Sequence, residues 1–172
     1  MNRRTTRGFS LLELGVVAIL LSILMAIFLE RLTFYQEAAE RAQFETTLQL
    51  YKTSLQIRLA ELILERREGE VRTLEVENPT RWLPARPANY AGNYPKQPQS
   101  GNWYFDGTTR ELVYIAHAGD RLAVTERDRV KQLRFRVKVI YQPVNMTGGQ
   151  VRGIGGIVLS PSVSYTWIVG AT

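Results

Sequence analysis

Residues 9–29 read FSLLELGVVAILLSILMAIFL, an apolar run in which Glu13 is the only ionisable side chain. As an α-helix this run is roughly 31 Å long, which matches the hydrocarbon core of a bilayer. A cleavable secretory signal has a shorter apolar core of about 7–15 residues, followed by a small-x-small cleavage site. Here the run continues directly into Glu30-Arg31-Leu32. We therefore predict that residues 9–29 form a retained membrane-spanning helix.

Basic residues flank the apolar run on its N-terminal side, at Arg3, Arg4 and Arg7. Because the positively charged flank of a membrane helix stays in the cytoplasm, we expect a cytoplasmic N-terminus and an exported C-terminal part. The formal net charge of the chain is +6, and three of its 22 basic residues lie in residues 1–8, so the remainder carries +3. This charge pattern favours a role in membrane topology over nucleic-acid binding.

Glu13 is the exception within the apolar run. A carboxylate inside a membrane helix costs about 2.5–3.5 kcal/mol and usually has a partner, but residues 9–29 contain no Lys, Arg or His. Cleavage between Gly8 and Phe9 would create an α-amino group four residues before Glu13. The amine of one subunit could then pair with Glu13 of a neighbour and set the axial register of adjacent helices. Alternatively, Glu13 reaches the cytoplasmic face of the membrane by itself.

The stretch Arg7-Gly8-Phe9-Ser10-Leu11-Leu12-Glu13 follows a short basic segment and precedes the apolar run. It resembles the prepilin signature of the type IV pilin and type II secretion pseudopilin family. The resemblance implies cleavage after Gly8, N-methylation of the new terminal Phe9, and registration of neighbouring subunits through Glu13 and Phe9. It covers residues 1–45 closely and is only architectural beyond them.

The same resemblance implies a pilin-like fold and a set of partners. These partners are a prepilin peptidase, other pilin or pseudopilin subunits, an inner-membrane assembly platform and membrane lipid. The chain would first lie in a bacterial inner membrane with a periplasmic C-terminal domain, and then enter a filament. Many major pilins have a proline in this helix, whereas residues 9–78 contain none. This departure favours a minor pilin or a pseudopilin.

The helix is expected to continue beyond the membrane. Residues 30–68 contain no Gly and no Pro and are rich in good helix formers. We predict one helix from Phe9 to Glu68, about 90 Å long, with Gly69 as its C-terminal stop. Spacings of three and four residues place one apolar set on a single face, namely Phe44, Leu48, Tyr51, Leu55, Leu59 and Leu62.

A second apolar set on this helix repeats every seven residues, at Leu50, Ile57 and Leu64. A helix that packs only on its own domain needs one apolar stripe. The second set therefore indicates either a further neighbour, such as another subunit, or leucines that are simply exposed. The sequence leaves both interpretations open.

The remaining residues predict an irregular connection over 69–102 and an antiparallel sheet over 103–172, so the fold class is α+β. Five of the seven prolines lie within residues 78–98, which is typical of a loop. Trp82, Tyr90 and Tyr94 are expected to pack this loop onto the sheet. Four or five strands against the long helix are expected from these stretches: Trp103–Asp106, Arg110–His117, Lys131–Gln142, and a last pair formed by Ile154–Leu159 and Val163–Val169.

The strand over Lys131–Gln142 alternates clearly between apolar and basic residues. An apolar face toward the helix and a polar face toward solvent are expected for a half-buried strand. The predicted inner set is Leu133, Phe135, Val137, Val139 and Tyr141, and the outer set is Arg134, Arg136 and Lys138.

Catalytic and metal-binding patterns are missing from the sequence. The chain contains no cysteine and one histidine, His117, so thiolate sites and the usual nucleophile–base pairs have no members. The glycines at positions 148, 149, 153, 155 and 156 lack the strand–loop–helix context of a phosphate-binding loop. The spacing of the available carboxylates matches no calcium loop, and these are Asp106, Asp120, Glu126 and Asp128. We expect neither an enzyme nor a cofactor or metal site.

Two functions follow from these patterns. The first is a structural subunit, of the minor pilin or pseudopilin kind, in a type IV pilus or type II secretion-like filament. The alternative is a competence-type pilin that binds the phosphates of DNA through a basic surface. That surface would come from Arg127, Arg129, Lys131, Arg134, Arg136 and Lys138, which otherwise form a solvated face.

Overall fold

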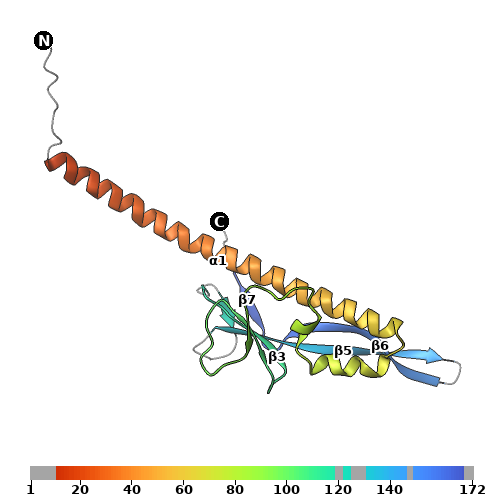
Figure 1. The fold of residues 1–172 in the computed structure, drawn as a ribbon. Coiled ribbons are helices and arrows are strands. Elements are labelled where there is room, and N and C mark those ends of the chain that lie inside the picture. Colours follow the sequence, from red (N-terminus) through yellow and green to blue (C-terminus); the bar gives the residue numbers. More distant parts are fainter. Residues whose placement is uncertain (1–10, 119–121, 125–130, 147–148, 169–172) are drawn as a thin grey trace, which may run out of the picture.

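A computed structural model describes residues 11–118, 122–124, 131–146 and 149–168 of the chain (Figure 1). One long helix, α1, is followed by two short 3-10 helices and then by strands, which is an α+β fold. The elements are α1 (Leu11–Leu64), η1 (Glu68–Glu75), η2 (Pro79–Trp82), β1 (Tyr90–Asn93), β2 (Trp103–Asp106), β3 (Glu111–Ile115), β4 (Leu122–Val124), β5 (Gln132–Met146), β6 (Gly149–Pro161) and β7 (Tyr165–Trp167).

The strands of the described residues form two sheets. The main sheet has the order β1-β2-β3-β5-β6, and β4 pairs with β7 in a separate sheet of two strands. All pairs are antiparallel except β1 with β2, which run parallel. The strands from residue 103 onward therefore pair antiparallel, as predicted. The prediction of an irregular connection over residues 69–102 is wrong at β1, which lies within it and adds a parallel edge strand. The loop between β1 and β2 returns alongside the sheet, so the chain enters β2 in the direction of β1.

The predicted last strand pair is also wrong. β6 extends to Pro161, which lies opposite Phe135 of β5, and the backbone N–H of Ser162 then bonds to the carbonyl of Arg134. The chain turns there and leaves the main sheet, so β7 pairs with β4 instead of β6. Val169, the predicted end of this strand, lies outside the described residues.

The core lies between the C-terminal half of α1 and one face of the main sheet. All six residues of the first predicted stripe are buried, and they are Phe44, Leu48, Tyr51, Leu55, Leu59 and Leu62. Phe44 stacks on Trp103 with ring centroids 5.3 Å apart and an interplanar angle of 2°. Four further rings lie around Phe44, from Tyr114, Phe135, Tyr165 and Trp167.

The alternation predicted for β5 is confirmed for its inner residues from Leu133 to Val139, which are buried. Tyr141 was assigned to the same set but is 37% exposed. Its ring lies below the guanidinium of Arg72, 6.0 Å from it. The pairing of β5 with β6 shifts its register between Ile140 and Tyr141, and Tyr141 lines an open pocket together with Ile63 and Arg72.

The loop residues expected to contact the sheet do so. Trp82 and Tyr90 pack against the main core. Tyr94 packs on the opposite face of the sheet, against a smaller cluster of Tyr104, Val113 and Ile115. The backbone N–H of Gln99 bonds to the Tyr104 hydroxyl at 2.9 Å and holds the loop over that face. Both faces of β2 and β3 are therefore covered.

The helix ends four residues earlier than predicted, and Gly69 is not its stop. The N–H of Arg67 bonds to the carbonyl of Leu62, and the N–H of Arg66 bonds to the carbonyl of Ile63. These two bonds define a Schellman motif with Arg66 in the left-handed position that glycine usually takes; its φ is 57°.

The early end has a physical reason in η1. After the turn, η1 buries Val71 and Leu74, which a straight extension of α1 would carry into solvent. The Glu75 carboxylate also accepts a 2.8 Å bond from the N–H of Val139, on β5. That N–H lies beyond the last residue of β5 paired with β3, Phe135. η1 therefore covers apolar surface and an open strand edge together.

The left-handed backbone at Arg66 predicts that Arg66→Gly stabilises the domain. A side chain in this conformation costs about 1–2 kcal/mol, and the greater freedom of unfolded glycine offsets part of the gain. We expect a net gain of about 0.5–1 kcal/mol, measured by thermal unfolding of the full chain in detergent.

Arg67→Gly is the matched control for this prediction. Arg67 has an ordinary φ of −103° and bonds to Glu65 and Glu70. Its replacement should lower the unfolding temperature. An equal response of the two variants would contradict the role of the Arg66 backbone.

Candidate functional site in the exposed half of the long helix

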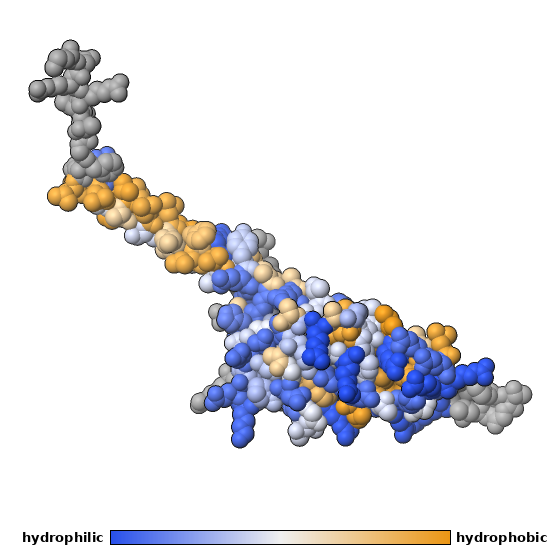
Figure 2. Space-filling model, viewed as in Figure 1, coloured by the Kyte–Doolittle hydropathy of each residue, from blue (hydrophilic) through white to orange (hydrophobic). Residues whose placement is uncertain are grey.

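The N-terminal part of α1 extends away from the domain, and its visible face is largely apolar (Figure 2). Glu13 and Ser22 are the only polar side chains among its residues 11–29. Every side chain from residue 11 to residue 29 is exposed, and the described residues contain one helix long and apolar enough to cross a membrane, which is α1. A helix that is apolar all round needs an apolar environment on every side. The domain does not provide this environment, and the length and composition of this part of α1 are compatible with membrane anchoring.

Glu13 lies in the first turn of α1 and is exposed. Its position is favourable, because the N-terminus of a helix attracts negative charge. The other polar side chain of this part, Ser22, satisfies its hydroxyl by bonding to the carbonyl of Ala18 at 2.8 Å. Among residues 11–29 of α1, Glu13 is thus the one side chain that needs a partner outside its own helix.

Gly8 and Phe9, the predicted cleavage and methylation positions, lie outside the described residues. The structure therefore places Glu13 but not its expected partner. The pairing of Glu13 with an amine on Phe9 of a neighbouring copy stays a prediction.

Two carboxylates fix α1 at the point where it reaches the domain. Glu37 is 4% exposed and accepts a 3.2 Å bond from the indole Nε1 of Trp167. Glu40, one turn later, accepts bonds from the Tyr114 hydroxyl at 2.7 Å and from the N–H groups of His117 and Ala118 at 2.7 and 2.6 Å. Bonds to an ionised acceptor are stronger than neutral ones, so these contacts hold α1 firmly against both sheets.

The Glu40 contact also keeps Tyr114 protonated. Burial raises the pKa of the Tyr114 hydroxyl far above its ordinary value, and the bond to the Glu40 carboxylate raises it further. The hydroxyl is therefore a permanent donor. The exposed His117 contributes its backbone N–H to this contact.

Sequence reasoning missed Glu37 and Glu40, because both look like solvated charges on an amphipathic helix. A signal was present at Glu37, which precedes the buried Phe44 by seven residues and so lies on the same helix face. An acidic residue on the buried face of a helix is expected to be buried as well, and to accept hydrogen bonds from the domain. Its donor, Trp167, lies 130 residues away along the chain and gives no local sign.

The basic face predicted for β5 is largely neutralised by acids. Arg134 lies 3.2 Å from both Asp106 and Glu111, and Arg136 lies 2.9 Å from Glu111. The Ser162 hydroxyl donates a further bond to Glu111 at 2.7 Å. These contacts form the Glu111 network, which pairs two of the six basic residues of the predicted DNA-binding surface with acids.

Four other residues belong to the predicted basic surface. Arg127 and Arg129 lie outside the described residues. Lys131 and Lys138 are both exposed.

Of the four carboxylates considered for calcium, Asp106 is the one that lies within the described residues. Asp106 bonds to Arg134 and to the N–H groups of Thr108 and Thr109. Asp120, Glu126 and Asp128 lie outside the described residues. Within those residues, no group of three or more potential metal ligands occurs.

The Glu111 network predicts a pH-dependent contribution to stability. Burial raises the pKa of Glu111, but bonds from Ser162 and Arg134 and the charge of Arg136 outweigh burial and hold this pKa below its ordinary value. The ionised group therefore stabilises the fold above the unfolded pKa of about 4.3, and this contribution is lost as the pH falls through the lower folded pKa.

We expect Glu111→Gln to lower the free energy of unfolding by about 1–3 kcal/mol at pH 7, with a smaller deficit at pH 3. Thermal unfolding of both proteins at the two pH values measures this difference. Glu45→Gln is the control, because the Glu45 pair with Arg41 is exposed and such pairs contribute little. A deficit of the same size at pH 3 and pH 7 would show that the charge of Glu111 is not the cause.

A comparison of the chain with family models, with curated proteins and with solved structures finds no match in any of the three.

Proposed function

We propose that this chain is a structural subunit, of the minor pilin or pseudopilin kind, of a type IV pilus or a type II secretion-like filament. The observation that carries the proposal is a single helix with two environments. Its first part is apolar all round with an acid in the first turn, and its second part is built into the core of the domain. A filament of bundled helices uses both parts at once.

The continuity of α1 separates this proposal from a simple membrane anchor. An anchor that only displays a domain can be joined to it by a flexible linker, such as a Gly/Ser-rich segment. Here one uninterrupted helix of 54 residues joins the apolar part to the core, and Glu37 and Glu40 fix its angle to the sheets. A rigid connection of this kind transmits position from a helix bundle to the domain outside it.

The second apolar set on α1 supports contacts between the helices of neighbouring subunits outside the bilayer as well. Leu50, Ile57 and Leu64 are 39%, 55% and 84% exposed, so the domain itself does not use them. Full burial of one such side chain contributes about 1.5–3 kcal/mol. In a filament, a neighbouring helix would cover them.

The proposed sequence of events starts with insertion of residues 9–29 into the inner membrane, with the C-terminal domain in the periplasm. Prepilin peptidase then cuts after Gly8 and methylates Phe9. The new amine of one subunit pairs with Glu13 of its neighbour, which removes an unpaired charge from an apolar bundle. An assembly platform in the inner membrane drives polymerisation, and the chain itself performs no catalysis.

The DNA-binding alternative receives less support from the geometry. Two of the six residues of its predicted surface, Arg134 and Arg136, are bonded to carboxylates in the Glu111 network. Phosphate binding there would have to break these pairs. We therefore retain the filament subunit as the proposed function.

The first test concerns processing. Mass spectrometry of the chain from cells with active prepilin peptidase should give a mature N-terminus at methylated Phe9. Cells with an inactive peptidase should give the chain with residues 1–8 still attached. An uncut chain in both strains would reject the proposal.

The second test concerns Glu13. We expect Glu13→Ala to be processed normally but to enter filaments at least about tenfold less than the unchanged chain, because loss of one member of a buried charge pair is costly. Immunoblots of sheared filaments measure incorporation. Ser22→Ala is the matched control, since the Ser22 hydroxyl bonds within its own helix. Normal incorporation of Glu13→Ala would exclude the register contact.

A further inference from the structure

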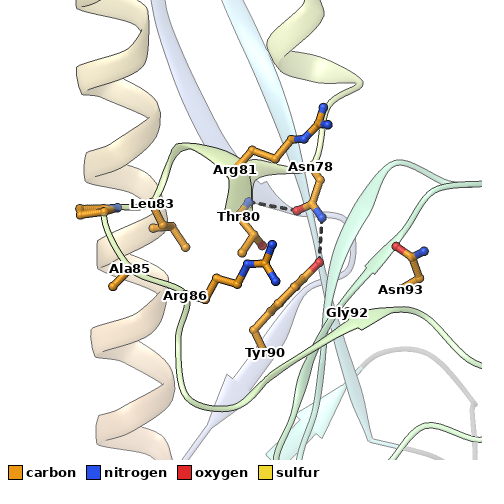
Figure 3. A pocket seen from close by; sticks show the side chains of 10 residues that line it. Asn78, Thr80, Arg81, Leu83, Ala85, Arg86, Tyr90, Gly92 and Asn93 are labelled. Carbon is orange, nitrogen blue, oxygen red and sulfur yellow. Dashed lines mark hydrogen bonds between the residues drawn. The ribbon is translucent and has the colours of Figure 1, made fainter.

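An open pocket of about 660 Å³ lies between η2 and β1, far along the chain from the exposed half of α1. The loop after η2 forms one wall and β1 forms the other (Figure 3). Its size falls within the range of about 300–1,000 Å³ that is typical of ligand sites. The proposed filament function does not use this pocket.

The charge of the pocket is positive. Arg81 and Arg86 line it, and its lining contains no acidic residue. Neither guanidinium forms an ion pair within the part of the chain that the structure describes. Arg86 points between Thr80 and Tyr90, whereas Arg81 extends away along the rim (Figure 3). Arg86 is therefore the cation that faces a ligand.

A chain of hydrogen bonds fixes the wall beside Arg86. The buried Tyr51 hydroxyl of α1 bonds to the Thr80 hydroxyl at 3.0 Å, and the Thr80 N–H bonds to the Asn78 side-chain oxygen at 3.0 Å. The Asn78 amide nitrogen then donates to the Tyr90 hydroxyl at 2.7 Å. Both ends of the Asn78 amide are thus defined, and the wall is tied to the core of the domain.

The direction of these bonds gives the pocket a second donor. Since the Tyr90 oxygen accepts a bond from Asn78, the Tyr90 hydroxyl proton is left to be donated elsewhere. A guanidinium and a hydroxyl donor on adjacent positions suit a carboxylate, which accepts several bonds and balances the charge. Because these hydrogen bonds fix the wall before the ligand arrives, less conformational entropy is lost on binding.

The other residues that line the pocket indicate the chemical class of the molecule to which the carboxylate belongs. Leu83, Pro84 and Ala85 provide an apolar wall, and the amide of Asn93 lies on the β1 side. A sugar ring has an apolar face of C–H groups and an edge of hydroxyls, which matches an apolar wall beside an amide. We propose that this pocket binds a carboxylate-bearing saccharide, with its acid on Arg86 and Tyr90 and its hydroxyls toward Asn93.

The test uses the full chain in detergent micelles, with binding measured by titration calorimetry. The probes are D-galacturonate, its neutral counterpart D-galactose, inorganic phosphate, and a short glutamate peptide, each up to about 10 mM. We expect galacturonate to bind at least about tenfold more tightly than each of the others, because only it offers both a carboxylate and a sugar ring.

Variants locate the site. Arg86→Gln should weaken galacturonate binding by about tenfold or more, since a charged hydrogen bond is lost. Tyr90→Phe, which keeps the ring, should weaken it by several fold. Lys96→Gln is the control, because Lys96 is exposed and does not line the pocket. Thermal unfolding of each variant checks that the domain remains folded.

Four outcomes would overturn the proposal. These are no binding of galacturonate, equal binding of galactose, tighter binding of phosphate or the glutamate peptide, and unchanged binding by folded Arg86→Gln. The filament function would survive each of them, because processing at Gly8 and the effect of Glu13→Ala are measured independently.

Discussion

The packing of one face of α1 against the main sheet is the contact on which the rest of the structure depends. Phe44 lies at its centre, stacked on Trp103 of β2 and surrounded by rings from β3, β5 and β7. Segments separated by more than a hundred residues therefore meet on one side chain. The same contact decides which part of α1 is left outside, because every side chain from residue 11 to residue 29 stays exposed.

The junction between the two parts of α1 is held by polar contacts and not only by apolar ones. Burying a carboxylate is unfavourable unless donors surround it, and Glu37 and Glu40 have donors from β7, β3 and the segment after β3. These bonds are directional, so they fix rotation of the helix as well as its distance from the sheet. A subunit whose outer domain must follow its helix in an assembly gains from such a junction.

The basic residues of the domain have two different surroundings. Arg134 and Arg136 share Glu111 and belong to the structure of the sheet face. Arg86 lines a pocket without acids, beside a wall fixed by Asn78. The net charge of the domain therefore does not locate an anion-binding site. The acidic residues around each arginine determine whether that arginine is available to an anion.

The sequence by itself determined the features that follow from local periodicity, including the apolar run, the buried face of α1 from Phe44 to Leu62, and the alternation along β5. It also located Glu13 as the exceptional charge. Only the tertiary structure decided the parallel β1, the pairing of β7 with β4, the left-handed Arg66, and the donors of Glu37. These features depend on which distant segments of the chain meet. They also depend on the need to bury apolar surface and to pair every buried polar group. A local sequence pattern contains no information about such long-range contacts.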